Sequence, residues 1–257
     1  MLIALTRPVS ESLAECALTH LERVPIDLDR ARHQHAAYED ALRALGVRVI
    51  RAPAADELPD AVFIEDTALV LDEVAVIARP GAVSRRREPE PVAAILSQFR
   101  PVQHLVAPAT LDGGDILLVG RTIYAGLSSR TNEAGVKQLA AHVGVFGYEV
   151  VSVPVRSCLH LKSAVSQVDD QLLLLNPQWV PAEVFAGLEY LAVADGEAGA
   201  ANALRVGDAL IYPVHYPWTA GRLAKRGLEV VPVPCDELAK AEGGVTCCSL
   251  LLNTPGG

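Results

Sequence analysis

The stretch Gly227-Leu-Glu-Val-Val-Pro-Val-Pro234 decides the fold, because the chain repeats its pattern four more times. Each copy is a short strand-like segment rich in β-branched residues, and four of the five copies stop at proline. The other copies span residues 46–53, 100–108, 147–154 and 187–194, so successive copies begin 54, 47, 40 and 40 residues apart. Near-regular self-similarity of this kind indicates a repeated structural unit.

The segments between these copies complete the unit. Apolar residues at helical spacing predict helices over residues 37–45, 92–99 and 136–143, each of which leads into one of the copies. Further strands are predicted over residues 61–64, 68–71, 74–78, 116–119, 122–125, 171–175 and 208–212. Each unit is therefore roughly strand–strand–helix–strand.

Five such units without a Ser/Gly-rich linker predict one closed, pseudo-symmetric domain over residues 1–257. We expect an α/β protein, a five-fold pseudo-symmetric α/β propeller of ββαβ-like units with its site on the central axis. The alternative is an ordinary doubly wound α/β fold. That fold is usually supported by a Gly-x-Gly-x-x-Gly turn after the first strand, and no such turn follows the first strand here.

Composition narrows the class of protein. Of the 257 residues, 51% are hydrophobic and 21% are charged, which excludes a disordered chain and a small disulfide scaffold. The formal net charge of -9 argues against nucleic acid as a partner. The apolar stretches are too short for a secretory signal or a membrane span. We therefore expect a soluble, cytoplasmic protein that does not bind membranes.

The five cysteines, at positions 16, 158, 235, 247 and 248, include no Cys-x-x-Cys pair. Their number and spacing suit neither a zinc site nor a disulfide framework, and they fit a reduced intracellular protein. Cys247 and Cys248 follow two glycines at the predicted start of the last strand, where alternation lets only one of them face a central site. Each is either a small buried hydrophobe or a nucleophile.

Two groups of carboxylates interrupt apolar segments. Glu65 and Asp66 lie inside a strand-like run, with Asp60 just before it. They form either a turn between two strands or an anionic pocket that binds a cation. Asp112 and Asp115 flank two glycines, in either a hairpin turn with solvated side chains or a second acidic pair at the mouth of a strand.

His160, Arg85 and Arg130 each have a structural and a functional interpretation. His160 lies among apolar neighbours, as a satisfied core residue or as a catalytic group. The arginines lie in loop-like sequence, as solvated surface residues or as carboxylate ligands. Together, a cysteine, a histidine and a carboxylate from different repeats match nucleophilic catalysis. The additional acids match a planar cation and the arginines match a carboxylate, so we expect an arginine-like substrate, with no metal and no cofactor.

Six motifs, in this order along the chain, carry a resemblance to a known family. They are residues 59–66 (PDAVFIED), 79–86 (RPGAVSRR), 110–115 (TLDGGD), 126–132 (GLSSRTN), 159–163 (LHLKS) and 246–249 (TCCS). The sequence resembles the dimethylarginine dimethylaminohydrolases, which are guanidino-group-modifying enzymes with the pentein fold. The resemblance spans almost the whole chain and implies a five-fold α/β propeller, in agreement with the repeat.

The resemblance also implies a role for individual residues. Cys247 would be the nucleophile, His160 the general acid and base, and Asp112 the carboxylate that orients the histidine. The implied substrate ligands are Asp60, Glu65 and Asp66 for the guanidinium, Arg85 and Arg130 for the α-carboxylate, Leu18 in a mobile lid, and Ala241 and Glu242 near the α-amine. The last two stand where the family often has an aliphatic residue followed by Asp.

One departure from a related family bears on the substrate. Arginine deiminases carry His-x-Asp where this chain has His160-Leu-Lys162. The missing aspartate removes a partner for an unsubstituted guanidinium nitrogen and leaves room for N-methyl groups. This difference favours a methylated arginine.

The expected reaction is hydrolysis of asymmetric dimethylarginine or monomethylarginine to citrulline and an amine, through a covalent thiouronium on the cysteine. An arginine deiminase, or another guanidino hydrolase or amidinotransferase on the same fold, is one alternative. A pentein that binds a ligand or partner without catalysis is another. A methylated arginine is the expected small-molecule partner, and a homodimer is possible.

Overall fold

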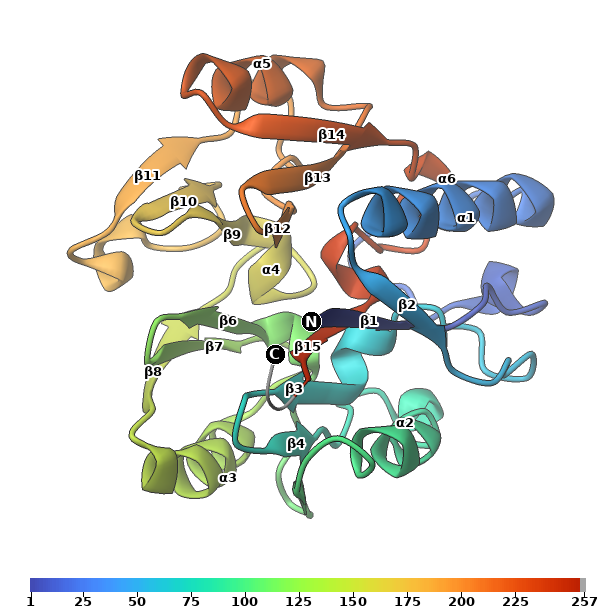
Figure 1. Ribbon diagram of the computed structural model, residues 1–257, viewed down its shortest axis with the longest axis vertical. Coiled ribbons are helices and arrows are strands. Elements are labelled where there is room, and N and C mark those ends of the chain that lie inside the picture. The colour runs from blue at the N-terminus through green and yellow to red at the C-terminus, as the bar shows by residue number, and fades with distance from the viewer. Residues whose placement is uncertain (255–257) are drawn as a thin grey trace.

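The computed structural model describes residues 1–254, in which fifteen strands form five separate three-stranded sheets around a common centre (Figure 1). The sheets have the strand orders β15-β1-β2, β3-β4-β5, β6-β7-β8, β9-β10-β11 and β12-β13-β14. The strands are β1 (Leu2–Thr6), β2 (Arg48–Arg51), β3 (Ala68–Val70), β4 (Ala75–Ile77), β5 (Val102–His104), β6 (Ile116–Val119), β7 (Thr122–Leu127), β8 (Glu149–Pro154), β9 (Val165–Asp169), β10 (Leu172–Leu175), β11 (Glu189–Ala192), β12 (Leu204–Val206), β13 (Ala209–Pro213), β14 (Glu229–Val233) and β15 (Leu250–Asn253).

Every sheet is built in the same way. Its middle strand pairs antiparallel with one neighbour and parallel with the other. A parallel pair needs a crossover, and four of the five crossovers contain an α-helix: α1 (Leu28–Ala44), α2 (Pro89–Leu96), α3 (Glu133–Val143) and α5 (Pro217–Lys225). The ββαβ unit and the five-fold α/β propeller predicted from the repeat are therefore confirmed.

The fifth crossover departs from the pattern. Between β10 and β11 the chain forms only the 3₁₀ helix Ala182–Phe185.

Two helices begin at a side chain that caps the first turn. The side chain of Asn132 accepts a hydrogen bond from the Gly135 amide at 2.8 Å, and that of Asp27 accepts one from the Arg30 amide at 3.0 Å. The Asn132 cap was expected from the sequence, whereas the Asp27 cap and the first turns of α1 were not.

The two ends of the chain share one sheet. β15 pairs antiparallel with β1, in a register that sets Ile3 opposite Leu252, and β1 pairs parallel with β2. The amide of Thr254 donates to the carbonyl oxygen of Met1 at 3.0 Å. The unit with the sheet β15-β1-β2 is thus completed only when the C-terminal strand returns to the N-terminal one.

The apolar core lies between neighbouring units. One cluster brings Ile3 and Leu252 of the shared sheet together with Ile77 of β4 and Leu96 of α2. Four further clusters join the remaining pairs of neighbours around the ring. Each unit therefore buries its apolar surface against the units beside it.

Two local predictions are wrong, and both concern residues near the centre. Residues 61–64 are not a strand; they run through a buried loop into the 3₁₀ helix Ile64–Thr67. Cys247 and Cys248 do not begin the last strand, because they lie in the 3₁₀ helix Thr246–Cys248 that precedes β15. In both places burial at the centre of the ring produced an apolar run of the kind that strands also show.

No helix within residues 1–254 has the length and apolarity that crossing a membrane requires.

Candidate active site

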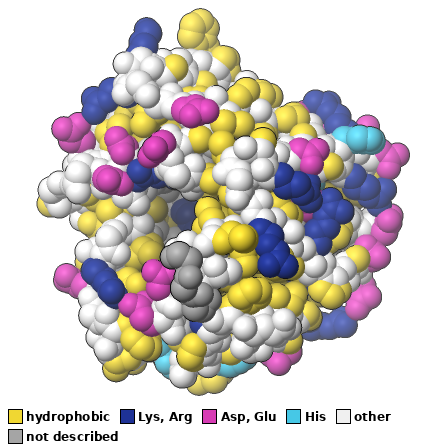
Figure 2. All heavy atoms as spheres, in the orientation of Figure 1, with side chains coloured by type: hydrophobic (Ala, Val, Ile, Leu, Met, Phe, Trp, Pro, Cys, Tyr) yellow, Lys and Arg dark blue, Asp and Glu magenta, His cyan; other side chains and the backbone are white. Residues whose placement is uncertain are grey.

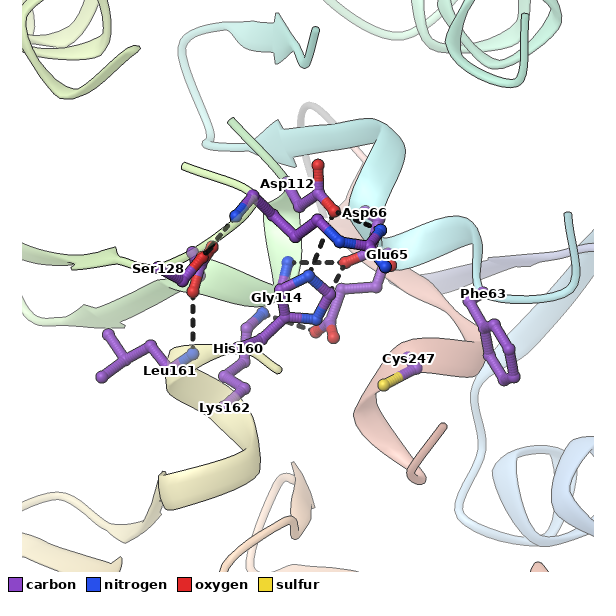
Figure 3. Close-up of polar contacts among 12 residues, drawn as sticks. Phe63, Glu65, Asp66, Asp112, Gly114, Ser128, His160, Leu161, Lys162 and Cys247 are labelled. Carbon is purple, nitrogen blue, oxygen red and sulfur yellow. Dashed lines mark hydrogen bonds and ion pairs between the residues drawn. The ribbon is translucent and has the colours of Figure 1, made fainter. Parts of the chain in front are cut away.

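The central residues of the candidate site come from equivalent places in four units, and Figure 3 shows them together: Glu65, Asp66, Asp112, His160 and Cys247. In each of these units a short helical turn directly precedes the first strand of the sheet. The turns are Ile64–Thr67 before β3, Gly113–Asp115 before β6, α4 (Leu161–Ala164) before β9 and Thr246–Cys248 before β15. These turns contact one another at the centre of the ring. The repeat thus gathers side chains that are far apart in the sequence.

His160 lies between two carboxylates and is 3% exposed. Its Nε2 atom is 3.1 Å from Asp112 Oδ2, and its Nδ1 atom is 3.7 Å from Asp66 Oδ1. Burial lowers the pKa of His160, but Asp66 and the hydrogen bond to Asp112 outweigh burial and raise it to about 9. The imidazole is therefore protonated at neutral pH and can act as an acid.

Asp66 is held as a carboxylate by its neighbours. Its Oδ2 atom accepts a 2.6 Å hydrogen bond from Arg85 Nη1, and its Oδ1 atom accepts one of 2.9 Å from the Gly114 amide. Burial raises the pKa of Asp66, but His160 and Arg85 lower it to about 2. Asp66 therefore offers a permanent negative charge beside the imidazole.

Arg85 is 2% exposed, so the solvated alternative is excluded. Its Nε and Nη2 atoms donate to the carboxylate of Glu88 at 3.0 and 2.8 Å. Its Nη2 atom also donates to the carbonyl oxygen of Phe63 at 3.1 Å. Nη1 also donates to Asp66, so most N–H groups of this guanidinium already bind acceptors within the protein. One hydrogen of Nη1 is left to bind another acceptor.

Arg130 is also buried but is less completely bound. Its Nη2 atom donates to Thr19 Oγ1 at 3.1 Å, and its Nη1 atom lies 3.7 Å from Asp112 Oδ2. Within residues 1–254 this Nη1 atom has no hydrogen-bond acceptor, although it is buried. Because a buried donor without a partner is costly, Nη1 is suited to receive an anion.

Asp112 lies behind His160 and is fully buried. Its Oδ1 atom accepts a hydrogen bond from the Gly81 amide at 2.9 Å, which leaves Oδ2 for the imidazole. Asp112 therefore fixes the orientation of the ring from the side away from Asp66.

The side-chain carboxylate of Asp115 connects two parts of the site. Its Oδ1 atom accepts from the Leu161 amide at 2.9 Å, next to the histidine, and its Oδ2 atom accepts from Ser128 Oγ at 2.6 Å. Ser128 Oγ in turn accepts from the Arg130 amide at 3.0 Å. Burial raises the pKa of Asp115 to about 6, although His160 opposes this effect. A Cβ at position 126 would lie 2.7 Å from Asp115 Oδ1, so Gly126 allows this approach.

Glu65 is bound by Lys162 and Thr246. Its Oε1 atom accepts from Lys162 Nζ at 2.5 Å, and its Oε2 atom accepts from Thr246 Oγ1 at 2.8 Å. Burial raises the pKa of Glu65, and Lys162 opposes that rise. This ion pair also lines a cavity of about 240 Å³ on the inner faces of β3, β6 and β15.

Cys247 is 9% exposed, and its sulfur points towards the side of the site that holds His160 and Glu65 (Figure 3). The Gly244 amide donates to Cys247 Sγ at 3.3 Å. Burial, together with Glu65 and Asp66, raises the pKa of Cys247 above its ordinary value. The thiol is therefore neutral in the empty site, and a cation bound nearby would favour the reactive thiolate. Cys247 lines two cavities, one of about 10 Å³ that His160 also lines and one of about 330 Å³ that Cys158 also lines. Cys248 is 1% exposed and lines neither of them, as expected for the packed neighbour of Cys247.

A segment near the N-terminus covers the site. The amides of Thr19, His20 and Leu21 all donate to the Glu242 carboxylate, at 2.9, 2.5 and 2.8 Å. The Ala17 amide donates to Asp60 Oδ2 at 3.1 Å. We call residues 17–21 the cover segment. Beneath it the remaining cavity is only about 10 Å³.

Most of the residues expected in the site line that cavity. They are Asp60, Asp66, Arg85, Arg130, His160, Ala241, Glu242 and Cys247, joined by Ala17, Phe63, Leu159 and Gly243. Three expected residues lie just outside its wall. Asp112 is behind the imidazole, Glu65 is beside Thr246, and the Leu18 side chain packs against the core cluster that contains Cys247.

Asp66, Asp112 and His160 also offer three ligand atoms within 4.8 Å of one another, a spacing that could hold a metal ion. Both ring nitrogens of His160 face carboxylate oxygens, which fits a protonated imidazole between two anions. A metal at this place would have to displace that proton.

Comparison with known proteins agrees with this geometry. The family model described as N,N dimethylarginine dimethylhydrolase, eukaryotic, matches residues 20–182. The N(G),N(G)-dimethylarginine dimethylaminohydrolase of Streptomyces coelicolor is 42% identical over 252 residues, which cover 97% of this chain and 96% of that protein. The chain belongs to the dimethylarginine dimethylaminohydrolase family.

Solved structures of this family superpose closely on the fold. A Pseudomonas aeruginosa dimethylarginine dimethylaminohydrolase, as a cysteine-to-serine variant complexed with citrulline, has a TM-score of 0.93 and 33% identity over 97% of this chain and 98% of that chain. A histidine-to-glycine variant of a dimethylarginine dimethylaminohydrolase, as the adduct with S-methyl-L-thiocitrulline, has a TM-score of 0.92 and 33% identity over 97% of this chain and 99% of that one. The pentein propeller is therefore shared throughout the chain.

Several residues that complete the site in this family member were missed by sequence reasoning. Glu88 forms an ion pair with Arg85. The sequence signal for this pair was the three-residue spacing between the two residues in an otherwise loop-like segment. Lys162 was noted only for what it replaces, and its ion pair with Glu65 was not anticipated. Phe63 lines the cavity against Gly243, where a Cβ would lie 2.1 Å from the ring. Nothing in the sequence marks this packing, because an aromatic residue in an apolar run is ordinary.

Proposed function

We propose that this protein hydrolyses Nω-methylated arginines to citrulline and the corresponding amine. The observation that carries the proposal is the protonated His160 held between Asp66 and Asp112, in the same small cavity as Cys247. This arrangement supplies a nucleophile and an acid together with a fixed negative charge for a guanidinium. Family membership over nearly the whole chain supports the choice of substrate class.

The proposed binding mode follows from the charges. The guanidinium lies near Asp60 and Asp66, where its charge meets carboxylates. The α-carboxylate is received by Arg130, whose Nη1 atom lacks an acceptor, with help from the remaining Nη1 hydrogen of Arg85. The α-amine lies near Glu242, beneath the cover segment.

The proposed reaction has two halves. When the substrate cation binds, the Cys247 thiol loses its proton to solvent, and the thiolate attacks the guanidinium carbon. The carbon–nitrogen bond to the methylated nitrogen breaks, and His160 gives its proton to the departing amine. The result is a thiouronium on Cys247.

In the second half, water attacks the thiouronium carbon and gives a proton back to His160. The carbon–sulfur bond then breaks, and citrulline leaves with the new oxygen while the thiolate is restored. The sum is one substrate cation and one water converted to citrulline and an alkylammonium ion. Asp112 keeps the imidazole in one orientation through both halves.

The test compares citrulline release from asymmetric dimethylarginine, monomethylarginine and arginine. We expect the methylated substrates to be faster, since Lys162 stands where the deiminases place an aspartate and is already paired with Glu65. Faster release from plain arginine would assign a deiminase instead. No citrulline from any of the three would support a binding protein without catalysis.

The covalent route is tested with two variants. Cys247→Ser should abolish turnover while the far-UV circular dichroism and the melting temperature stay those of the wild type. His160→Gly should accumulate an added mass on Cys247, because the attacking water loses its proton acceptor and hydrolysis of the thiouronium becomes slower than its formation. Near-normal turnover by Cys247→Ser would overturn the covalent route.

The compartment is also a proposal. All five cysteines are buried and none is paired. Such thiols support a reducing compartment, the cytoplasm, which fits the expectation from their spacing.

A further inference from the structure

The fifth unit also places a side chain at the centre of the ring. In the other units the turn before the first strand carries Glu65 and Asp66, Asp112, His160 or Cys247. In the fifth unit the matching place, just before β12 (Leu204–Val206), is occupied by Asn202. The proposed mechanism gives this residue no role.

Asn202 is 7% exposed, and all of its hydrogen-bonding groups are used. Its Nδ2 atom donates to the carbonyl oxygen of Lys162 at 3.0 Å and to Thr246 Oγ1 at 2.9 Å. Its Oδ1 atom accepts from the Thr246 amide at 3.1 Å. One amide therefore connects α4, which follows the histidine, to the 3₁₀ helix that contains the nucleophile.

These contacts determine where the single hydroxyl hydrogen of Thr246 points. Because Asn202 Nδ2 donates to Thr246 Oγ1, the hydroxyl hydrogen is free to go to Glu65 Oε2, 2.8 Å away. A carboxylate at position 202 would compete for that hydrogen. Glu65 would then lose one of the two groups that hold it.

The same contacts shape the loop around the nucleophile. A Cβ at position 244 would lie 2.4 Å from Asn202 Oδ1, so the loop is wrapped closely on this amide at Gly244. Gly244 donates its amide hydrogen to Cys247 Sγ. Asn202 thus supports the segment that directly precedes the nucleophile at two points, Gly244 and Thr246.

We propose that Asn202 is a positioning residue that sets the Thr246–Cys248 turn against Glu65 and α4, so that the Gly244 amide is aimed at Cys247. The proposal rests on the proposed function for its kinetic consequences. The expected effect of Asn202 on the reactivity of the Cys247 thiol does not depend on the proposed function.

The first experiment compares Asn202→Asp with a matched control, Asn176→Asp. Asn176 is also a buried asparagine, 3% exposed. Its side chain donates to the carbonyl oxygen of Ala198 at 2.8 Å and accepts from the Gln178 amide at 3.0 Å. Unlike Asn202, it lines neither of the two cavities that Cys247 lines. Both variants lose a buried donor, so their losses of stability should be similar.

We expect Asn202→Asp to lower kcat roughly 10- to 100-fold, the range for loss of a hydrogen bond to a charged group, with KM within about threefold of the wild type. The rate of Cys247 alkylation by iodoacetamide should fall, and its pH dependence should move to higher pH, because a carboxylate is added and the Gly244 amide is no longer held. Asn176→Asp should leave kcat and alkylation unchanged. Equal kinetic effects in both variants, or wild-type kinetics in Asn202→Asp, would overturn the proposal.

A double variant checks that Asn202 acts through Thr246. Thr246→Val removes the hydroxyl but keeps the shape of the side chain. In that background Asn202→Asp should cost at most about threefold in kcat, because the hydrogen bonds it disturbs are already reduced. A full multiplicative loss would show that Asn202 acts elsewhere and would overturn the proposal.

The two proposals can fail separately. Alkylation of Cys247, followed by mass spectrometry, needs no substrate. If the wild type released no citrulline from methylated arginines, the proposed function would fail, while the alkylation comparison would still decide the role of Asn202.

Discussion

His160 titrates as part of a group of charges rather than alone. Asp66, Asp112 and Asp115 each favour its protonated form and together exceed the cost of burial. Because its pKa of about 9 in the folded protein lies above the ordinary value of 6.5, the stability that this ion pairing contributes is fully present below about pH 6.5. That stability is lost as the pH rises through about 9. The same proton is the one that the leaving amine needs, so stability and activity should both fall on the alkaline side.

Asp115 offers a test of this coupling without touching the reacting groups. Asp115→Asn removes a negative charge that raises the pKa of His160. We therefore expect the alkaline limb of the kcat profile to move down by roughly half a unit to one unit, measured as citrulline release against pH. An unchanged limb would mean that another group controls it.

Asp115→Asn should also change how the free energy of unfolding depends on pH. The folded protein holds the proton of Asp115 more tightly than the unfolded chain does, since its pKa is raised from 3.8 to about 6. Its ionisation therefore costs stability as the pH rises between about 4 and 6. In Asp115→Asn, urea unfolding at several pH values should lack this downward slope.

At the scale of elements, one carboxylate binds most of the backbone amides that fasten the cover segment. Three consecutive amides, from Thr19 to Leu21, donate to Glu242. Glu242 itself adopts a positive φ of 60°, a conformation that non-glycine residues rarely take. A strained residue that binds three amides is suited to a contact that is made and broken as substrate enters and leaves.

We therefore expect Glu242→Gln to loosen the cover segment. Hydrogen bonds to an ionised group are roughly twice as strong as neutral ones, so KM should rise about tenfold, with a smaller change in kcat. In the absence of substrate, trypsin should cleave after Arg23 faster than in the wild type. Glu183→Gln, at an exposed glutamate far along the chain, is the control. A higher KM with unchanged cleavage would assign Glu242 to substrate binding alone.

The elements were predicted from the sequence with uneven success. The strands 116–119 and 68–71 agree with β6 and β3 to within one residue, because each is a short apolar run bounded by polar residues or glycine. The central turns were missed as elements, although their residues were identified. Residues 61–64 are apolar and buried like a strand, and only the contacts of the turn Ile64–Thr67 with the other turns decide the conformation there.

The partners of the site residues were the least predictable. Asp66 and Cys247 could be picked out by residue type and motif, whereas the bonds that Glu88, Thr246 and Asn202 make depend on which turns the ring brings together. Those are contacts between distant segments, and periodicity in one sequence carries no information about them.

At the scale of the whole molecule, each apolar cluster belongs to two neighbouring units, so we propose that residues 1–257 unfold as a single domain. Leu252 of β15 packs with Leu96 of α2 and Ile77 of β4, which belong to the next unit. No unit described in residues 1–254 keeps its apolar surface covered without its neighbours.

Leu252→Ala tests this cooperativity. Leu252 is 3% exposed, so truncation should cost about 2–5 kcal/mol of unfolding free energy. The two tryptophans, Trp179 and Trp218, lie in other units, yet their fluorescence transition should shift together with the far-UV circular dichroism. Val145→Ala, at a valine that is 79% exposed, should change neither. A tryptophan transition that stays in place would mean that the units unfold separately.

The pairing of β15 with β1 also has a consequence for biosynthesis. The nucleophile turn and the strand that follows it are the last part of the site to be translated, and their partner strand β1 is the first. The carboxylates, the histidine and the arginines are made before the thiol exists. A nascent chain is thus an incomplete ring with an exposed edge on β1 until residues 246–253 have been made, and Cys247 joins the other site residues only at that stage.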